Sequence, residues 1–172
     1  MGKDRRCAME LSDALVPRVY AALQQRASQL LRSGGGSLSP QSLVHDVLLK
    51  LYRSESQTWR DEQHFRTVAA IAMRQLLIDR ARRKAAAKHG ANAEHVSLTG
   101  VAGAPGFADL VDLADALEQL EAARPRAAQV VVYRLLGGLS HDEIADELGC
   151  SVTTVKREWR LGQAWMQQRL GH

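Results

Sequence analysis

LSHDEIADELGCSVTTVKREWRLGQAWM, residues 139–166, is the stretch that decides the fold of this chain. Ser140 and Glu143 have the spacing of a capping box, which opens a short helix with one apolar face. Gly149 ends that helix, because glycine adopts the left-handed conformation of a helix C-cap without strain. Ser151 is placed to cap a second helix. The stretch therefore predicts two helices joined by a tight turn.

The second of these helices has two chemically different faces. Its apolar residues recur with the three-and-four spacing of a buried stripe, and they are Val152, Val155, Trp159, Gly162 and Met166. The opposite face is polar and basic, with Thr153, Lys156, Arg157, Arg160, Gln163 and Gln167. Such a helix fits the DNA major groove, where Lys and Arg reach phosphates and guanine edges. The alternative is a solvated face on an ordinary helical hairpin.

Two helices are expected before this motif, and a linker before them. The first, at 109–123, has leucines inside and acids outside, and the second, at 127–136, begins after Pro125. Together with the motif they make a four-helix unit at 108–172. Residues 89–107 contain four glycines and no hydrophobic periodicity, so we expect a flexible linker.

Three further helices are expected in residues 1–88. The first runs from Leu11 to Arg32. The second opens with Ser39 as N-cap and Pro40 at the first helical position. Its outer surface carries His45, Asp46, Leu49 and Lys50. An exposed Leu among charges hints at a partner-binding face, although contact with a neighbouring helix is the commoner explanation.

The third of these helices, from Phe65 to Lys84, is strongly basic at its end. Its expected core stripe is Phe65, Val68, Ile71, Ala72 and Leu76. Asp79 lies near that stripe with Arg82 one turn on, which predicts a partly buried ion pair. The other bases are Arg74, Arg80, Arg83 and Lys84. The helix dipole accounts for part of this cluster, and its density argues for phosphate as well.

Charge is distributed unevenly along the chain, beneath a net value of +4. Residues 1–88 hold 16 Lys or Arg against 8 Asp or Glu, whereas residues 89–172 hold 7 against 11. Within the second part, residues 109–147 carry nine acids and three bases, and residues 152–172 carry four bases and one acid. The pattern indicates nucleic acid at two places, with acidic packing or partner surfaces between them.

Composition favours helical packing in a chain of 172 residues. Hydrophobic residues make up 45% and aromatic residues only 5%, with Leu, Ala and Val dominant and no alternating strand pattern of useful length. No signal segment opens the chain and no run approaches the roughly 18 to 20 apolar residues of a membrane span, so we expect a cytoplasmic protein without membrane insertion. Cys7 and Cys150 are too isolated for a metal site or disulfide framework, and no cofactor is expected.

The order of these features resembles the extracytoplasmic-function (ECF) sigma factors, the small two-domain initiation subunits of bacterial RNA polymerase. The resemblance spans about residues 11–170 and rests on three stretches: SLVHDVLLKLY, HFRTVAAIAMRQLLIDRARRK and GGLSHDEIADELGCSVTTVKREW. They are similar to that family's polymerase-binding helix, promoter-melting helix and DNA-reading helix-turn-helix. The resemblance implies an all-α fold of two small domains, at 1–88 and 108–172.

Each stretch acquires a role from the resemblance. The helix at 40–52 would dock on the clamp coiled coil of core RNA polymerase through His45, Asp46, Leu49 and Lys50. The minus-ten element and the separated strand would be held by Trp59, His64, Phe65, Arg74, Arg80, Arg83 and Lys84. The minus-thirty-five element of promoter DNA would be read by Thr153, Thr154, Lys156, Arg157 and Arg160. The acidic helix at 109–123 faces either a partner, such as an anti-sigma factor, or solvent, and solvent is the expectation.

Two other functions stay open. A helix-turn-helix repressor or activator acting without polymerase explains 139–166 but gives no role to the basic helix ending at Lys84. An adaptor that binds polymerase or a regulator without starting transcription would keep the same fold. An enzyme is least favoured, because the sequence has no HExxH motif and no phosphate-cradling glycine loop. We therefore expect a sigma factor without catalytic residues.

Overall fold

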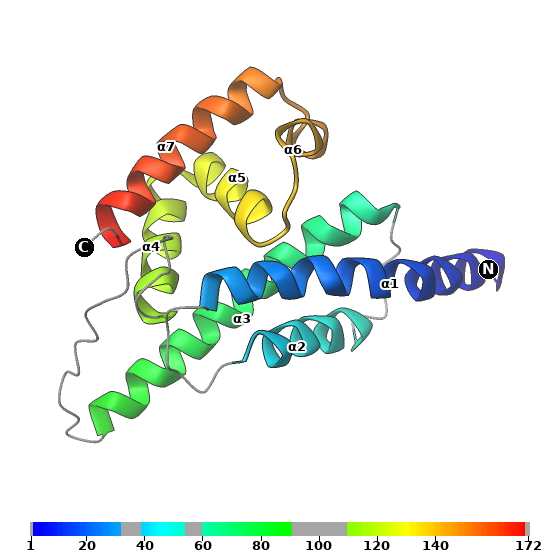
Figure 1. Cartoon of the computed structure of the whole chain (residues 1–172), viewed down its shortest axis with the longest axis horizontal. Helices are drawn as coiled ribbons and strands as arrows, with labels where there is room; N and C mark the ends of the chain where they lie inside the picture. Colours follow the sequence, from blue (N-terminus) through cyan, green and yellow to red (C-terminus); the bar gives the residue numbers. More distant parts are fainter. Residues whose placement is uncertain (1, 32–38, 54–59, 91–109, 171–172) are drawn as a thin grey trace.

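The computed structural model describes residues 2–31, 39–53, 60–90 and 110–170, and within them the chain is helical without strands (Figure 1). The all-α fold is confirmed. The helices are α1 (Gly2–Leu31), α2 (Pro40–Arg53), α3 (Glu62–Gly90), α4 (Leu110–Ala123), α5 (Pro125–Leu135), α6 (His141–Leu148) and α7 (Val152–Leu170).

Helix α1 begins well before Leu11, where the sequence led us to expect its start. Pro17 therefore lies inside the helix and not near its beginning. Helix α2 has the expected start, because the Ser42 amide donates to Ser39 Oγ at 3.0 Å and Pro40 is the first helical residue. The buried face of α2 consists of Leu43, Val44, Val47, Leu48 and Leu51.

Helix α3 extends beyond both of its expected ends. It begins after Asp61, whose Oδ1 accepts from the His64 amide at 2.7 Å and so acts as an N-cap. At the other end three alanines, residues 85–87, continue the helix, because alanine is the best helix former. The start of the expected linker is therefore wrong: His89 and Gly90 are helical. The rest of 89–107 lies outside the described residues.

The core stripe expected on α3 is partly wrong. Phe65 and Ala72 are buried, but Ile71 is 47% exposed. Alanines and longer side chains form most of the buried surface, which includes Ala69, Ala70, Met73, Leu77, Ile78 and Ala81. Helices α1, α2, α4 and α5 all contact α3, and its small residues let these helices approach closely. The large apolar residues alone therefore did not identify the buried face.

Helices α4 to α7 form the expected four-helix unit, and this unit packs against α3. Figure 1 shows α2 and α4–α7 on opposite sides of α3. One buried cluster runs through both parts and contains Leu23 of α1, Met73 of α3 and Val131 of α5. A smaller cluster joins Ile78 and Ala81 of α3 to Ala114 of α4. The boundaries of the two domains stay a prediction.

Candidate nucleic-acid interface

Helices α6 and α7 form the helix-turn-helix, and each expected cap is present. The Glu143 amide donates to Ser140 Oγ at 3.2 Å, and the Ser140 amide donates to Glu143 Oε2 at 2.6 Å. Gly149 ends α6 at φ 59°, a conformation that glycine adopts at little cost. Ser151 Oγ accepts from the Thr154 amide at 3.2 Å and caps α7. These bonds fix the angle at which α7 leaves the turn.

Helix α7 is buried along the expected stripe. Val155, Gly162 and Met166 are buried, and Val152 and Trp159 are partly buried. Gly162 lies so close to α5 that a Cβ added to it would be 2.3 Å from Val131 Cγ2. The absence of a side chain at this position therefore sets the approach of α5 and α7.

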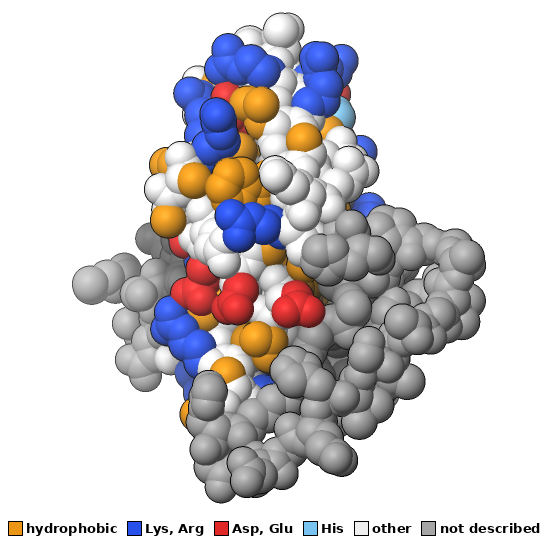
Figure 2. Space-filling view, turned by 90° about the vertical axis from the view of Figure 1, so that its left-hand side faces the viewer, with side chains coloured by type: hydrophobic (Ala, Val, Ile, Leu, Met, Phe, Trp, Pro, Cys, Tyr) orange, Lys and Arg blue, Asp and Glu red, His pale blue; other side chains and the backbone are white. Residues whose placement is uncertain are grey.

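The opposite face of α7 is open to solvent. Its exposed residues are Thr153, Lys156, Arg157, Arg160, Gln163 and Gln167. Thr154 is half-buried and shares a 2.9 Å hydrogen bond with Ser151. Arg157 donates to Glu158 at 3.0 Å and still keeps 66% of its side chain exposed. Figure 2 shows several Lys and Arg side chains at the upper end of the molecule and a group of acids lower down, with further Lys or Arg side chains beside these acids.

His141 lies at the start of α6, with its ring centroid 6.5 Å from that of Trp159. Burial lowers the pKa of His141, and the charges of Arg134 and Lys156 lower it further, while Asp142 opposes them. The lowered pKa favours the neutral imidazole and so opposes an added positive charge beside the basic face of α7. Its position supports a packing role.

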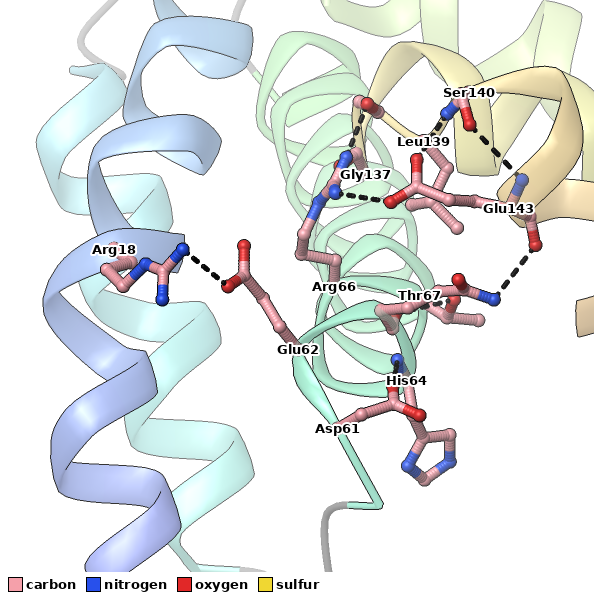
Figure 3. A network of polar contacts seen from close by, with 12 residues as sticks. Arg18, Asp61, Glu62, His64, Arg66, Thr67, Gly137, Leu139, Ser140 and Glu143 are labelled. Atoms are coloured by element: carbon pink, nitrogen blue, oxygen red, sulfur yellow. Dashed lines mark hydrogen bonds and ion pairs between the residues drawn. The ribbon is translucent and has the colours of Figure 1, made fainter.

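Arg66 of α3 holds the segment that leads into the helix-turn-helix (Figure 3). Its Nε donates to the Gly137 carbonyl at 3.1 Å, its Nη1 to Glu143 Oε1 at 3.0 Å, and its Nη2 to the Gly138 carbonyl. Burial raises the pKa of Glu143, but the hydrogen bonds from Ser140 and the charge of Arg66 outweigh it and lower the pKa below its ordinary value. Glu143 is thus a carboxylate shared by the cap and by α3.

Further arginines on or just before α3 pair with acids of α4 and α6. The pairs are Arg60 with Glu147 at 3.3 Å, Arg74 with Glu121, and Arg82 with Glu118 at 2.5 Å. They show that the acidic helix does not face solvent along its whole length, contrary to expectation: Glu118 and Glu121 face α3.

The residues expected to hold the melted strand have different environments. Trp59 lies outside the described residues. Phe65 is 2% exposed, so in this conformation its ring belongs to the core and cannot stack on a base. Arg74 and Arg80 keep only 15% and 19% of their side chains exposed, because Glu121 and Asp46 accept hydrogen bonds from them. His64 is partly buried, while Arg83 and Lys84 are exposed.

The ion pair expected between Asp79 and Arg82 is wrong. Arg82 pairs with Glu118 of α4, and Asp79 instead accepts from Gln75 Nε2 at 3.2 Å. A local i, i+3 contact on a helix stabilises by only about 0.2–0.5 kcal/mol, so an acid on a neighbouring helix can replace it. Spacing along one helix does not reveal that neighbour.

The outer surface of α2 agrees with the sequence interpretation at most positions. His45 and Lys50 are exposed, and Leu49 is 38% exposed. Asp46 is half-buried and accepts a hydrogen bond from Arg80. Tyr52, which is 57% exposed, was missed. Its position three residues after Leu49 could have revealed it, because residues at i and i+3 share one face of a helix.

The fold is of the all-α class, with a helix-turn-helix whose second helix has an exposed basic face. Along its length from residue 7 to residue 172, the chain matches the ECF sigma factor family. It belongs to that family, and it is therefore a sigma factor, a protein of transcription initiation. Neither a curated protein nor a solved structure matches the chain significantly. None of the helices that the structure describes has the length and apolar character needed to cross a membrane.

Proposed function

We propose that this sigma factor docks on core RNA polymerase through α2 and directs initiation at promoters with a minus-thirty-five and a minus-ten element. The observation that carries the proposal is the basic face of α7, which is solvent-exposed and held at a fixed angle by the caps of the turn. A helix presented in this way fits the major groove.

Reading of the minus-thirty-five element is assigned to Thr153, Thr154, Lys156, Arg157 and Arg160. Lys156, Arg157 and Arg160 are exposed and form no ion pair with another helix among the described residues. Their cationic groups are available to phosphates and to the N7 and O6 atoms of guanine. Thr154 is half-buried and bonded to Ser151, so it holds the start of α7 and has less surface than the other four for contact with DNA.

Binding of the minus-ten element is assigned to α3. Arg83 and Lys84 are exposed at its end, and Arg74 and Arg80 lie farther back on the same helix. A basic track of this kind suits the backbone of a separated strand, which is recognised mainly by charge. Opening of the strands also requires a surface for an unstacked base, and Trp59, at the start of the predicted stretch from Trp59 to Phe65, is the candidate for it.

Docking on core polymerase is assigned to the outer face of α2. Leu49 and Tyr52 are large apolar side chains exposed to solvent, and His45 and Lys50 flank them. Apolar anchors surrounded by polar residues are typical of protein interfaces. Asp46 takes part in α2–α3 packing through Arg80, so Lys50→Glu is a cleaner test of docking than a change at Asp46.

The test is run-off transcription by core polymerase on a pool of genomic promoter fragments, with and without the protein. We expect discrete start sites that appear only with the protein. Arg157→Ala should reduce these transcripts about tenfold, as expected for loss of one specific base or phosphate contact. Arg126→Ala removes an exposed arginine of α5 and should leave them unchanged.

Two other outcomes would replace this proposal. Binding to core polymerase without new transcripts would indicate an adaptor. Specific binding to duplex DNA without any affinity for polymerase would indicate an ordinary helix-turn-helix regulator. A normal transcript level from the Arg157→Ala variant would refute the reading role of that residue.

A further inference from the structure

Arg157 and Glu158 are neighbours on α7, and two hydrogen bonds join their side chains. The Nε and Nη2 groups of Arg157 donate to Glu158 Oε1 at 3.3 Å and 3.0 Å. The side chain of Glu158 is only 12% exposed, whereas that of Arg157 is 66% exposed. A mostly buried side chain has few rotamers open to it, so the position of the acceptor is restricted. The carboxylate therefore restrains a guanidinium that lies on the outer face of the helix.

The two hydrogen bonds use one edge of the Arg157 guanidinium and leave another edge free. A guanidinium is planar and has five N–H donors in fixed directions. Glu158 accepts from Nε and from one N–H of Nη2, so Nη1 and the second N–H of Nη2 remain available. These remaining groups form a fork of parallel donors. In the major groove, the N7 and O6 atoms of guanine are the acceptor pair that fits such a fork.

We propose that Glu158 is a positioning residue for Arg157, and that Arg157 reads a guanine of the minus-thirty-five element. Lys156 and Arg160 bind phosphates instead. The inference rests on the function proposed for α7. A guanidinium that is held before DNA arrives loses less conformational entropy on binding. Its fork also points in a set direction, so a base that lacks the two acceptors is rejected.

The charges on α7 favour this division of roles. The carboxylate of Glu158 compensates the charge of Arg157, and attraction to phosphates depends on net positive charge. Lys156 and Arg160 are exposed, and no acid in the described part of the chain pairs with either of them. Arg160 Nε donates only to the backbone carbonyl of Lys156, at 3.4 Å. Their charges are therefore uncompensated, as phosphate binding requires.

The first test measures base preference with the holoenzyme formed by core RNA polymerase and the full chain. The probe is a promoter fragment from the run-off experiment whose minus-thirty-five element is replaced by random duplex sequence, and bound fragments are sequenced. The unchanged protein should select guanine at one position about tenfold over the other bases. Arg157→Ala should lose the preference at this position and keep those at the others.

The role of Glu158 is tested with two substitutions of different severity. Glu158→Ala removes the acceptor and should reduce the guanine preference about fivefold, whereas Glu158→Gln keeps an acceptor oxygen and should retain part of the preference. Added to Arg157→Ala, Glu158→Ala should change the base preference no further, because it acts through Arg157. The matched control is Glu147→Ala, which removes a similarly buried acid of α6, 14% exposed, and should leave the preference unchanged.

The dependence of binding on salt tests the assignment to base or phosphate. Lys156→Ala should weaken binding to all sequences alike and reduce the slope of log affinity against log salt concentration by about 1, as expected for one phosphate contact. Arg157→Ala should leave this slope nearly unchanged. A slope reduced as much by Arg157→Ala as by Lys156→Ala would overturn the assignment of Arg157 to a base.

Three results would overturn the role of Glu158. An unchanged guanine preference in Glu158→Ala would show that Arg157 needs no positioning, and a stronger preference would show that Glu158 withholds Arg157 from DNA. A uniform loss of preference at every position, with a lower denaturation midpoint, would mean that Glu158 only stabilises α7. If the unchanged holoenzyme selects no sequence at all, the reading function proposed for α7 fails, and the role of Glu158 fails with it.

Discussion

Helices α3 and α7 are both basic, but their arginines are in different electrostatic states. On α3, Arg66 and Arg74 each keep 15% of their side chains exposed and are bound to glutamates of other helices. On α7, Arg157 is 66% exposed and its acidic partner is the next residue of the same helix. A basic helix in a sequence is therefore not equivalent to a basic surface. Acids brought in by neighbouring helices decide how much of its charge is available.

The positions of the two helices in the fold explain this difference. Helix α3 contacts α1, α2, α4 and α5, so most of its circumference is covered, and several of its arginines must find a partner. Helix α7 contacts α4, α5 and α6 along one stripe and leaves its other face to solvent. The charges of Arg66 and Arg74 therefore serve packing in this state. The bases at the end of α3 and those on the outer face of α7 stay exposed.

The largest effect on stability is expected from Gly162→Ala, which adds a methyl group to the buried side of α7. The new Cβ would lie 2.3 Å from Val131 Cγ2, so α7 must move away from α5. We expect the free energy of unfolding to fall by about 3 kcal/mol, the upper range for overpacking of a core. Denaturant unfolding followed by circular dichroism measures it. An unchanged denaturation midpoint would mean that the α5–α7 contact can widen without loss of stability. The control is Ala164→Ser on the exposed side of α7, which should leave the midpoint unchanged.

The sequence predicted the local features of the interface well. Ser39, Ser140, Gly149 and Ser151 all cap as expected, because capping depends on residues only a few positions apart. The exposed face of α7 was correct for the same reason: helical periodicity determines it once the buried stripe is known.

The partners of the basic residues on α3 could not be predicted in the same way. The contact from Arg74 to Glu121 joins residues far apart in the sequence, on helices whose packing depends on the whole fold. The alternation of basic and acidic blocks along the chain indicated that acidic packing surfaces exist, but not which acids meet which arginines. Ile71 was misplaced because the buried face of α3 is built largely from alanines.

A smaller effect is expected from Arg66→Ala, which removes three hydrogen bonds between α3 and the segment before α6. The Gly137 and Gly138 carbonyls and the Glu143 carboxylate lose their donor. Loss of partners at partly buried groups of this kind costs about 2 kcal/mol. Arg157→Ala, on the open face of α7, should change stability by less than about 0.5 kcal/mol. Equal losses of stability in the two variants would refute the claim that Arg66 on α3 serves packing whereas Arg157 on α7 does not.

Stability should also depend on the protonation of Glu143. Its folded-state pKa is depressed, so the carboxylate stabilises the folded protein at pH values above its ordinary pKa of 4.5, and this contribution disappears as the pH falls through the depressed value. Glu143→Gln keeps a capping side chain without the charge. Denaturant unfolding of both proteins should therefore show a difference at pH 7 that shrinks toward pH 3. A difference that is constant over this range would rule out an ionised Glu143 as the source.

The smallest effect is expected from Arg60→Ala. Arg60 lies 3.3 Å from Glu147, but 66% of its side chain is exposed, unlike that of Arg66, which follows six residues later and is 15% exposed. Exposed ion pairs contribute at most about 1 kcal/mol and are screened by salt, so we expect a loss below about 0.5 kcal/mol that vanishes in 0.5 M salt. Thermal unfolding at low and high salt measures it. A loss as large as that of Arg66→Ala would mean that charge alone holds α3 against the helix-turn-helix. A small loss means that the mostly buried guanidinium of Arg66, with its several hydrogen bonds, has that role.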